Sequence, residues 1–332
     1  MKKIAVLGAG TWGMALARQL VLGGNQVTVW SALEQEIDRL SAGEKHPNLP
    51  MMEIPETIAF TKSLEDACGG TDILLFAVPS VFVRTTAAKV RPYFKKEQIV
   101  VDVAKGIEAE TLMTMSEILS QELGLTNAPV ALSGPTHAEE VALDLPTAIV
   151  SASADPLHAE LVQDLFLHTC MRVYTNPDIR GVELCGAMKN IIALASGIAA
   201  GLGYGDNAKA AIITRGLAEI TRLGMTMGCQ AQTFAGLAGI GDMIVTATST
   251  HSRNNRAGML IGQGLSPKDA VQQVGMVVEG INALPAAMKL AERYRVEMPI
   301  ITAAADVILR NADPAETVHQ LMDRRQKKET VF

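Results

Sequence analysis

A lysine and an asparagine lie side by side in a stretch of the sequence that is otherwise apolar. The stretch covers residues 181–197, GVELCGAMKNIIALASG, with Lys189 and Asn190 at its middle. A helix formed by this stretch would be apolar on almost all sides, so we expect it to be buried. The polar pair at its middle argues against a membrane span. Burying an ammonium group is costly unless a partner or loss of the proton compensates. Lys189 is therefore either functional or a structural lysine, which would pair with an acid such as Glu183 or Asp242 or extend to the surface.

A second group of polar residues begins 62 residues after Asn190 and could bind an anion. Residues 252–256 read SRNNR and follow a glycine-rich approach, GLAGIGD. Arginine suits bidentate binding of phosphate, and serine and asparagine add neutral donors. A solvated polar loop is the alternative, although the glycines favour a ligand that comes close to the backbone. Just before this group, Asp242 and Thr246 are four residues apart and would share one face of a helix.

The N-terminus carries a glycine pattern that could bind a dinucleotide. A β-rich run at 3–7 precedes GAGTWG, and a helical segment and a second strand at 27–30 follow it. This order of elements is the one in which the dinucleotide fingerprint occurs. Gly8 permits the tight turn, Gly10 allows close approach of a pyrophosphate, and Gly13 lets the helix pack against the strand. The helix then offers unpaired N–H groups to the anion, so an ordinary glycine-rich turn is the weaker interpretation.

The residue after the second strand is Ser31, which leaves the choice between NAD and NADP open. An acid at this tip binds the ribose 2′-hydroxyl of NAD, whereas an arginine accommodates the 2′-phosphate of NADP. Ser31 is neither, and we expect NAD or NADP as the cofactor.

Apolar runs at 71–78, 98–103, 130–133, 147–151 and 171–174 predict further strands. Continuous apolar strands indicate a parallel sheet covered on both faces, where ligands bind at the carboxyl ends of the strands. Ser80, Lys105 and the turn 134–138 fall at that edge. Lys105, beside a glycine, is either a solvated residue or a functional one.

The strand-like runs stop near residue 176, and helical segments continue from there. We expect an α/β fold with a Rossmann-like N-terminal domain at residues 1–178 and an all-helical C-terminal domain at 179–332. A net charge of −6 without a basic stripe argues against nucleic acid as a partner. Four scattered cysteines, no ligand-spaced histidines and no signal segment predict a cytoplasmic protein without a metal site or stable membrane insertion.

Taken together, these motifs resemble those of the bacterial type of NAD(P)-dependent glycerol-3-phosphate dehydrogenase. GAMKN at 186–190 is similar to that family's G-A-x-K-N motif, and GAGTWG is similar to its cofactor turn. SGPTHAEEV at 133–141, GIGD at 239–242, SRNNR and VVEG at 277–280 follow in the family's order. The resemblance covers nearly the whole chain. Many bacterial members have arginine shortly after the tryptophan that ends the second strand, where this chain has Ser31.

The resemblance implies reversible reduction of dihydroxyacetone phosphate to sn-glycerol 3-phosphate, a phospholipid precursor. It implies Lys189 as general acid/base, with Lys105, Asp242, Asn190 and Thr246 as further catalytic residues. The implied substrate contacts are Lys105, Gly134, Thr136, Lys189, Asp242, Ser252, Arg253 and Asn254. The implied cofactor contacts are Gly8, Gly10, Thr11, Trp12, Gly13, Ser31, Lys105, Ala138, Arg253, Val277 and Glu279.

Two other readings of the sequence stay open. One is a related two-domain dehydrogenase of the 6-phosphogluconate or 3-hydroxyacid type, which the pairing of GAMKN with SRNNR disfavours. The other is a non-catalytic module that senses NAD(P), which would need neither the buried lysine nor the anion site. The apolar helical domain also predicts a homodimer.

Overall fold

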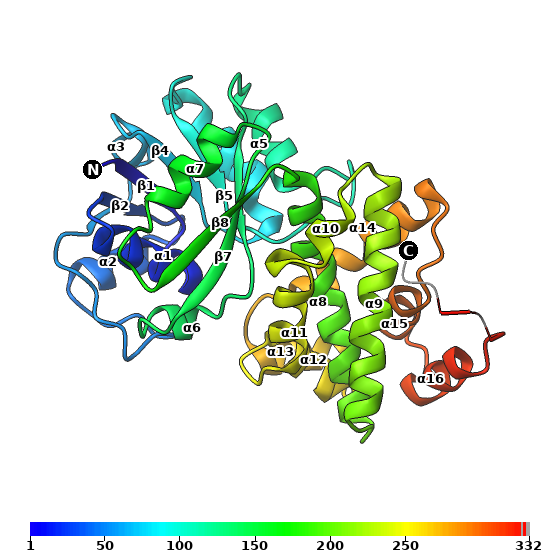
Figure 1. Ribbon diagram of the computed structural model, residues 1–332. Coiled ribbons are helices and arrows are strands. Elements are labelled where there is room, and N and C mark those ends of the chain that lie inside the picture. The colour runs from blue at the N-terminus through cyan, green and yellow to red at the C-terminus, as the bar shows by residue number, and fades with distance from the viewer. Residues whose placement is uncertain (327, 330–332) are drawn as a thin grey trace. The chain divides into compact units, whose positions relative to one another are not determined.

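The computed structural model of the chain describes residues 1–326 and 328–329 and divides it into two compact units (Figure 1). Unit 1 comprises Met1–Lys105 and Met115–Ile179, and unit 2 comprises Gly106–Thr114 and Arg180–Phe332. The sequence pattern gives no sign that the short segment Gly106–Thr114 belongs with the later helices. It does so because Ile107 is buried in the core of unit 2 and the Lys289 ammonium donates to the Ala109 carbonyl at 2.8 Å.

Unit 1 is built on one eight-stranded sheet with the order β3-β2-β1-β4-β5-β6-β7-β8. Its strands are β1 (Lys3–Leu7), β2 (Gln26–Trp30), β3 (Ala59–Thr61), β4 (Ile73–Phe76), β5 (Ile99–Asp102), β6 (Val130–Ser133), β7 (Thr147–Ala152) and β8 (Met171–Asn176). All strands expected from the apolar runs are present. The three-residue edge strand β3 lacks such a run and is not predicted from the sequence.

The expectation of a wholly parallel sheet is wrong at one position, because β6 and β7 pair antiparallel. The other neighbouring strands pair parallel. Between β6 and β7 lies only the single-turn helix α6 (Ala138–Val141). A parallel connection needs a crossover, usually a helix long enough to span the sheet, and a four-residue helix is too short for this. The chain therefore returns directly as an antiparallel strand.

Helices accompany the sheet of unit 1. They are α1 (Thr11–Leu22), α2 (Glu34–Ser41), α3 (Leu64–Cys68), η1 (Ser80–Phe82), α4 (Val83–Val90), η2 (Arg91–Tyr93), α5 (Met115–Leu123), α6 and α7 (Pro156–Asp164). The inner strands β1 and β4 are almost completely buried, as expected for strands covered on both faces. The first six strands follow the order of a Rossmann sheet, which confirms the predicted fold of this unit.

From Arg180 onward, the described residues of unit 2 form helices joined by short connections, without a strand. It contains α8 (Ile179–Gly201), α9 (Asp206–Thr226), α10 (Ala231–Phe234), η3 (Leu237–Gly241), α11 (Asp242–Thr248), α12 (Arg253–Gly262), α13 (Pro267–Val274), α14 (Glu279–Tyr294), α15 (Pro299–Arg310) and α16 (Pro314–Met322). Residues of α9, α11, α12 and α14 pack directly on α8. This central helix is long and apolar enough to cross a membrane, but 83% of its most apolar window is buried within the structure, as predicted for a core helix.

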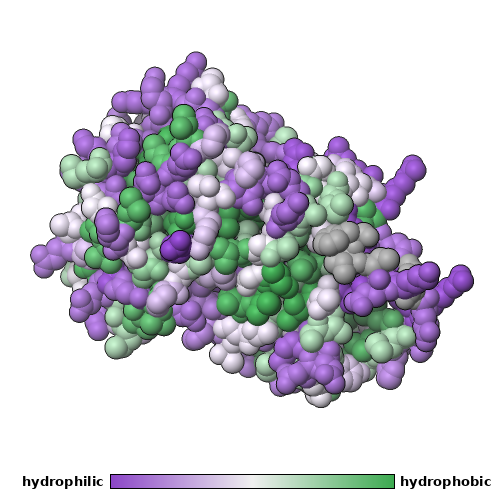
Figure 2. All heavy atoms as spheres, viewed as in Figure 1, coloured by the Kyte–Doolittle hydropathy of each residue, from purple (hydrophilic) through white to green (hydrophobic). Residues whose placement is uncertain are grey.

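The surface contrasts with these cores. On the face seen in Figure 2, hydrophilic side chains are interspersed with smaller hydrophobic areas, the usual pattern of a folded protein surface. Among the buried residues of the described chain, Lys189 of α8 is the only lysine or arginine, which makes its surroundings in unit 2 a candidate site.

Candidate active site

The ammonium group of Lys189 lies inside the core of unit 2 with two polar partners. Its Nζ atom is 2.5 Å from Oδ1 of Asp242 and 2.5 Å from Oγ1 of Thr246. The lysine side chain is 6% exposed and the aspartate side chain is fully buried. Thr246 also donates its hydroxyl proton to the Asp242 carbonyl one turn earlier on α11, at 2.6 Å. The carboxylate balances the charge, and the hydroxyl helps to fix the position of the ammonium group.

The backbone before Asp242 explains how this carboxylate reaches the core. Residues Leu237–Gly241 form a π-helical turn, and α11 begins at Asp242. Within the turn, Gly239 packs so closely that a Cβ atom there would lie 2.0 Å from the Phe234 carbonyl oxygen. Such π-turns are rare and frequently occur at functional sites. The glycine-rich segment before Asp242 therefore serves to position the Asp242 carboxylate.

Asn190, the neighbour of Lys189, connects three helices of unit 2. Its Oδ1 accepts from Nδ2 of Asn254 at 3.0 Å, and Oδ1 of Asn254 accepts from the Gly280 N–H at 2.8 Å. A Cβ atom on Gly280 would lie 2.5 Å from the Asn190 carbonyl oxygen. The starts of α12 and α14 are thus tied to the turn of α8 that carries the lysine. Val277 and Glu279 lie next to this contact, just before and at the start of α14.

The SRNNR group forms the N-terminus of α12. Ser252 is its N-cap, and the serine hydroxyl accepts from the Asn255 N–H at 3.2 Å. Arg253 is the first helical residue and is exposed, whereas Asn254 is buried. The solvated loop considered for this segment is therefore excluded by its helical structure. An exposed arginine at the first turn of a ten-residue helix combines a guanidinium group with the unpaired N–H groups of the helix end, which suits an anion.

In unit 1, the glycine turn joins β1 to α1 as predicted. Gly8 has φ +132°, and a Cβ atom there would lie 2.6 Å from the Ala77 carbonyl oxygen. A Cβ atom on Gly13 would lie 2.1 Å from the Gly8 carbonyl oxygen, whereas one on Gly10 would meet nothing within 4 Å. Two glycines are therefore required by close packing, and the third leaves open space beside the start of α1, where Thr11 and Trp12 lie. This arrangement fits a dinucleotide whose pyrophosphate approaches the backbone at Gly10.

A smaller polar group gathers at the ends of β5 and β6. The Gly134 carbonyl accepts from Nζ of Lys105 and from the Thr136 hydroxyl, both at 3.1 Å. The Oγ atom of Ser133 is buried and has no hydrogen-bond partner among the described residues. An unpartnered buried hydroxyl is uncommon and marks this edge as a place where a bound molecule could supply the partner. Ala138 follows as the first residue of α6.

Two models of one protein family match most of the chain. The model of the NAD-dependent glycerol-3-phosphate dehydrogenase N-terminus matches residues 3–159, and that of the C-terminus matches residues 178–319. The chain belongs to the NAD-dependent glycerol-3-phosphate dehydrogenase family. The resemblance stated from the motifs, the oxidoreductase class and the NAD or NADP cofactor are thereby confirmed, and the 6-phosphogluconate or 3-hydroxyacid type is not supported.

Individual relatives agree with this placement in the family of dehydrogenases. A glycerol-3-phosphate dehydrogenase (NAD(P)+) 2 from Lactobacillus delbrueckii subsp. bulgaricus is 60% identical and covers 99% of both chains. A glycerol-3-phosphate dehydrogenase (NAD(P)+) from Agathobacter rectalis is 49% identical, with 99% of this chain and 98% of its own covered. The crystal structure of glycerol-3-phosphate dehydrogenase from Coxiella burnetii has a TM-score of 0.93 at 35% identity, covering 97% of this chain and 99% of that one.

Two side chains of this dehydrogenase contact the glycine turn, although no sequence motif predicts these contacts. Nε2 of His46 lies 3.2 Å from the Ala9 carbonyl oxygen, and the Asn48 amide donates to the Thr11 hydroxyl at 3.2 Å. Burial lowers the pKa of His46, against the opposing effect of its contact with Ala9. The segment that carries them has no regular secondary structure and no motif, so only folding reveals that it lies against the turn.

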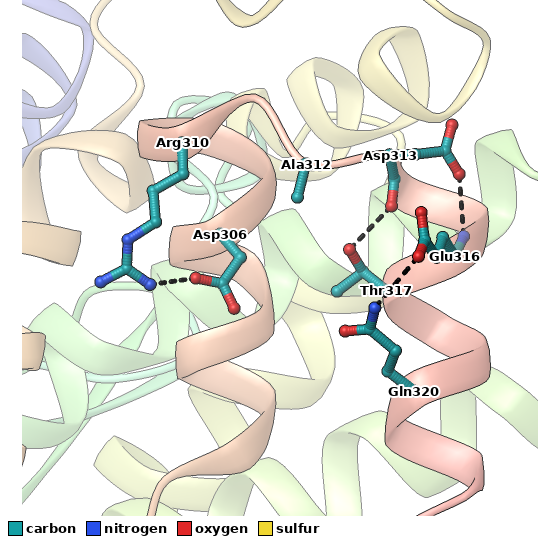
Figure 3. A pocket seen from close by; sticks show the side chains of 7 residues that line it. All are labelled: Asp306, Arg310, Ala312, Asp313, Glu316, Thr317 and Gln320. Carbon is teal, nitrogen blue, oxygen red and sulfur yellow. Dashed lines mark hydrogen bonds and ion pairs between the residues drawn. The ribbon is translucent and has the colours of Figure 1, made fainter.

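A polar groove elsewhere in the dehydrogenase does not belong to these groups. Figure 3 shows it between α15 and α16 of unit 2. Its volume is about 210 Å³. Its side chains mainly stabilise the two helices: Asp313 caps α16 through the Glu316 N–H, and Arg310 pairs with Asp306 one turn away. The groove holds no residue with a predicted role in catalysis or binding.

Proposed function

We propose that this chain reversibly reduces dihydroxyacetone phosphate to sn-glycerol 3-phosphate with NADH or NADPH. The observation that carries the proposal is the Lys189, Asp242 and Thr246 group, buried in the same unit as the cationic start of α12. When bound, the reduced nicotinamide supplies a hydride to the C2 carbonyl carbon of the substrate. The residues of the chain bind the substrate, orient it and supply the proton.

In the reduction, Lys189 stabilises the negative charge that develops on the carbonyl oxygen and delivers a proton to it. Asp242 and Thr246 hold the ammonium group in place, and Asn190 fixes the turn beside it. The same pair could be merely structural, as the sequence alone allowed. However, replacing a buried ion pair with apolar residues is often neutral or stabilising, so stability gives little reason to keep a charge here.

We propose that the start of α12 binds the phosphate of the substrate. The Arg253 guanidinium and the backbone N–H groups of the first turn supply the donors. The Asn254 side chain forms the link to Asn190, so Asn254 contributes its backbone N–H. Ser252 acts as the helix cap: its hydroxyl accepts from the Asn255 N–H, and its own N–H donates to the Ser249 carbonyl. Binding energy from the phosphate then positions the reacting carbon. Lys105, Gly134 and Thr136 are proposed as further substrate contacts.

The nucleotide is proposed to bind chiefly at the glycine turn of unit 1. Gly8, Gly10, Gly13, Thr11 and Trp12 would hold the pyrophosphate against the start of α1. The further cofactor contacts proposed on the family pattern are Ser31, Lys105, Ala138, Arg253, Val277 and Glu279. In this proposal residues 1–178 form the nucleotide domain and residues 179–332 the substrate domain.

The first experiment follows the absorbance of NADH and NADPH separately, with and without dihydroxyacetone phosphate. We expect substrate-dependent oxidation of at least one nucleotide and little oxidation with dihydroxyacetone, which lacks the phosphate. A protein that binds both nucleotides without turnover would instead be a sensor, and the proposed reaction would be rejected.

We further propose that the enzyme is a cytoplasmic homodimer that supplies glycerol 3-phosphate for phospholipid synthesis. The family's reaction product is the support for the metabolic role. Light scattering after size exclusion tests the dimer, and cell fractionation tests the location. Depletion of the enzyme should create a requirement for added glycerol 3-phosphate, and growth that stays independent of it would contradict the metabolic role.

A further inference from the structure

The tip of β2 carries a carboxylate that the linear sequence does not place there. Ser31 is the first residue after β2 and is 6% exposed. Its hydroxyl donates to Oε2 of Glu36 at 2.6 Å and accepts from the Leu33 N–H at 3.1 Å. Glu36 is half-buried on the first turn of α2. The first turn of α2 therefore places the Glu36 carboxylate at the end of β2.

The strand tip that this carboxylate contacts is joined to the glycine turn. The Gly8 N–H donates to the carbonyl of Trp30, the residue before Ser31, at 2.7 Å. The end of β2 and the start of the turn are thus in direct contact. In dinucleotide-binding sheets, an acid at the end of the second strand accepts a hydrogen bond from the ribose 2′-hydroxyl. Glu36 supplies such an acid from the following helix.

The positively charged side chains of the neighbouring segment do not pair with this carboxylate. Lys62 pairs with Asp38 at 2.7 Å and lies 3.5 Å from Glu34. The Arg39 guanidinium contacts the Gln35 carbonyl at 3.4 Å through Nε. Within the part of the chain that the structure describes, Glu36 itself forms no ion pair. A 2′-phosphate brought to this position would be repelled by a carboxylate that has no ion-pair partner, whereas a 2′-hydroxyl would find an acceptor.

We infer that Glu36 selects NAD(H) over NADP(H) in this chain. The inference rests on the proposed function, because it assumes that the nucleotide binds at the glycine turn. Ser31 has a supporting role: it holds the carboxylate at the strand tip and does not itself distinguish the two cofactors.

The test measures dissociation constants, so it does not depend on turnover. The only two tryptophans of the chain, Trp12 and Trp30, both lie in this region of unit 1, and their fluorescence can follow titration with NADH or NADPH. We expect NADPH to bind at least about tenfold more weakly than NADH to the unaltered protein. The variant Glu36→Gln retains an oxygen that can accept from Ser31. Its ratio of Kd for NADPH to Kd for NADH should be at least about threefold lower than in the unaltered protein, mainly through tighter NADPH binding.

Glu34→Gln is the matched control, because it removes the same charge from the same turn of α2 without touching Ser31. Its ratio of Kd for NADPH to Kd for NADH should stay within about twofold of that of the unaltered protein. Equal binding of both nucleotides to the unaltered protein would overturn the inference, as would equal effects of the two glutamine variants. Tighter NADPH binding that Arg39→Ala abolishes would also overturn it and assign the 2′-phosphate to the arginine. If neither nucleotide binds, the proposed function fails first.

Discussion

Gly258 of α12 packs against Leu194 of α8 so closely that a Cβ atom on the glycine would lie 2.1 Å from the leucine carbonyl oxygen. Gly197 of α8 packs in the same way against the carbonyl of Asn255 on α12. The two helix backbones are therefore in direct contact. Because α8 carries Lys189 and α12 begins with Arg253, this contact fixes the spacing between the proposed proton donor and the proposed phosphate-binding residue.

Gly258→Ala should force these helices apart. We expect a loss of at least about 2 kcal/mol in the free energy of unfolding, because the clash involves backbone that cannot move aside. The KM for dihydroxyacetone phosphate should rise as well. Urea unfolding and steady-state kinetics measure the two effects. Gly205→Ala is the control, since a Cβ there meets nothing within 4 Å and should cost less than about 1 kcal/mol. Equal effects of the two changes would contradict the role of the contact.

Lys189 can be tested without leaving a buried charge unpaired. In the double variant Lys189→Met with Asp242→Asn, both charges of the pair are removed, so the fold should persist. We expect kcat to fall at least about 1000-fold, a loss of roughly 4 kcal/mol of transition-state stabilisation, while NADH binding stays unchanged. Near-normal kcat in a folded double variant would show that the pair is structural.

Arg253→Ala should act on the phosphate of the substrate. Losing a charged hydrogen bond should raise the KM for dihydroxyacetone phosphate at least about tenfold. The weak reduction of dihydroxyacetone should change little, because this analogue has no phosphate. Arg256→Ala is a matched control, being exposed on the same helix about one turn later. A similar loss with both substrates would argue against a phosphate-binding role.

Glu219 should make stability depend on pH. Burial raises the pKa of this carboxyl group from 4.5 to about 7, although hydrogen bonds from the Ile300 and Ile301 N–H groups and the nearby Arg222 and Arg324 act in the opposite direction. Between pH 4.5 and 7 the folded protein therefore holds a proton that the unfolded chain releases, so stability falls as pH rises through this window.

Glu219→Gln removes this titration. The stability of the unaltered protein relative to the variant should decrease by roughly 2 kcal/mol from pH 5 to 7.5, as measured by urea unfolding at both pH values. The comparison with the variant cancels the titration of all other groups. A difference that is constant over this range, or that grows with pH, would show that the carboxyl group ionises normally in the fold.

Much of the fold could be predicted because the relevant signals are local. The glycine turn, the apolar strands and the apolar helix around Lys189 each follow from residues close together in the chain. For Lys189 the sequence allows pairing with an acid such as Glu183 or Asp242 or extension to the surface, and the structure places Asp242 beside it. The antiparallel direction of β7 does not follow from the sequence pattern, because strand direction depends on the length of the connecting helix and an apolar run carries no information about direction.

The sequence by itself determined which chemical groups this protein has: a nucleotide turn, a lysine in an apolar helix and an arginine-containing helix start. Only the tertiary structure decided how these groups are used. Ser252 and Asn254 are residue types that often bind ligands. In the folded protein, however, the Ser252 side chain caps α12 and the Asn254 side chain links α8 to α14. Ser31 had no informative partner in the linear sequence until α2 brought Glu36 to it. The physical reason is that residue type fixes what a side chain can donate or accept, whereas its partners depend on the folded backbone. This holds for residues five positions apart, such as Ser31 and Glu36, and for residues 64 apart, such as Asn190 and Asn254.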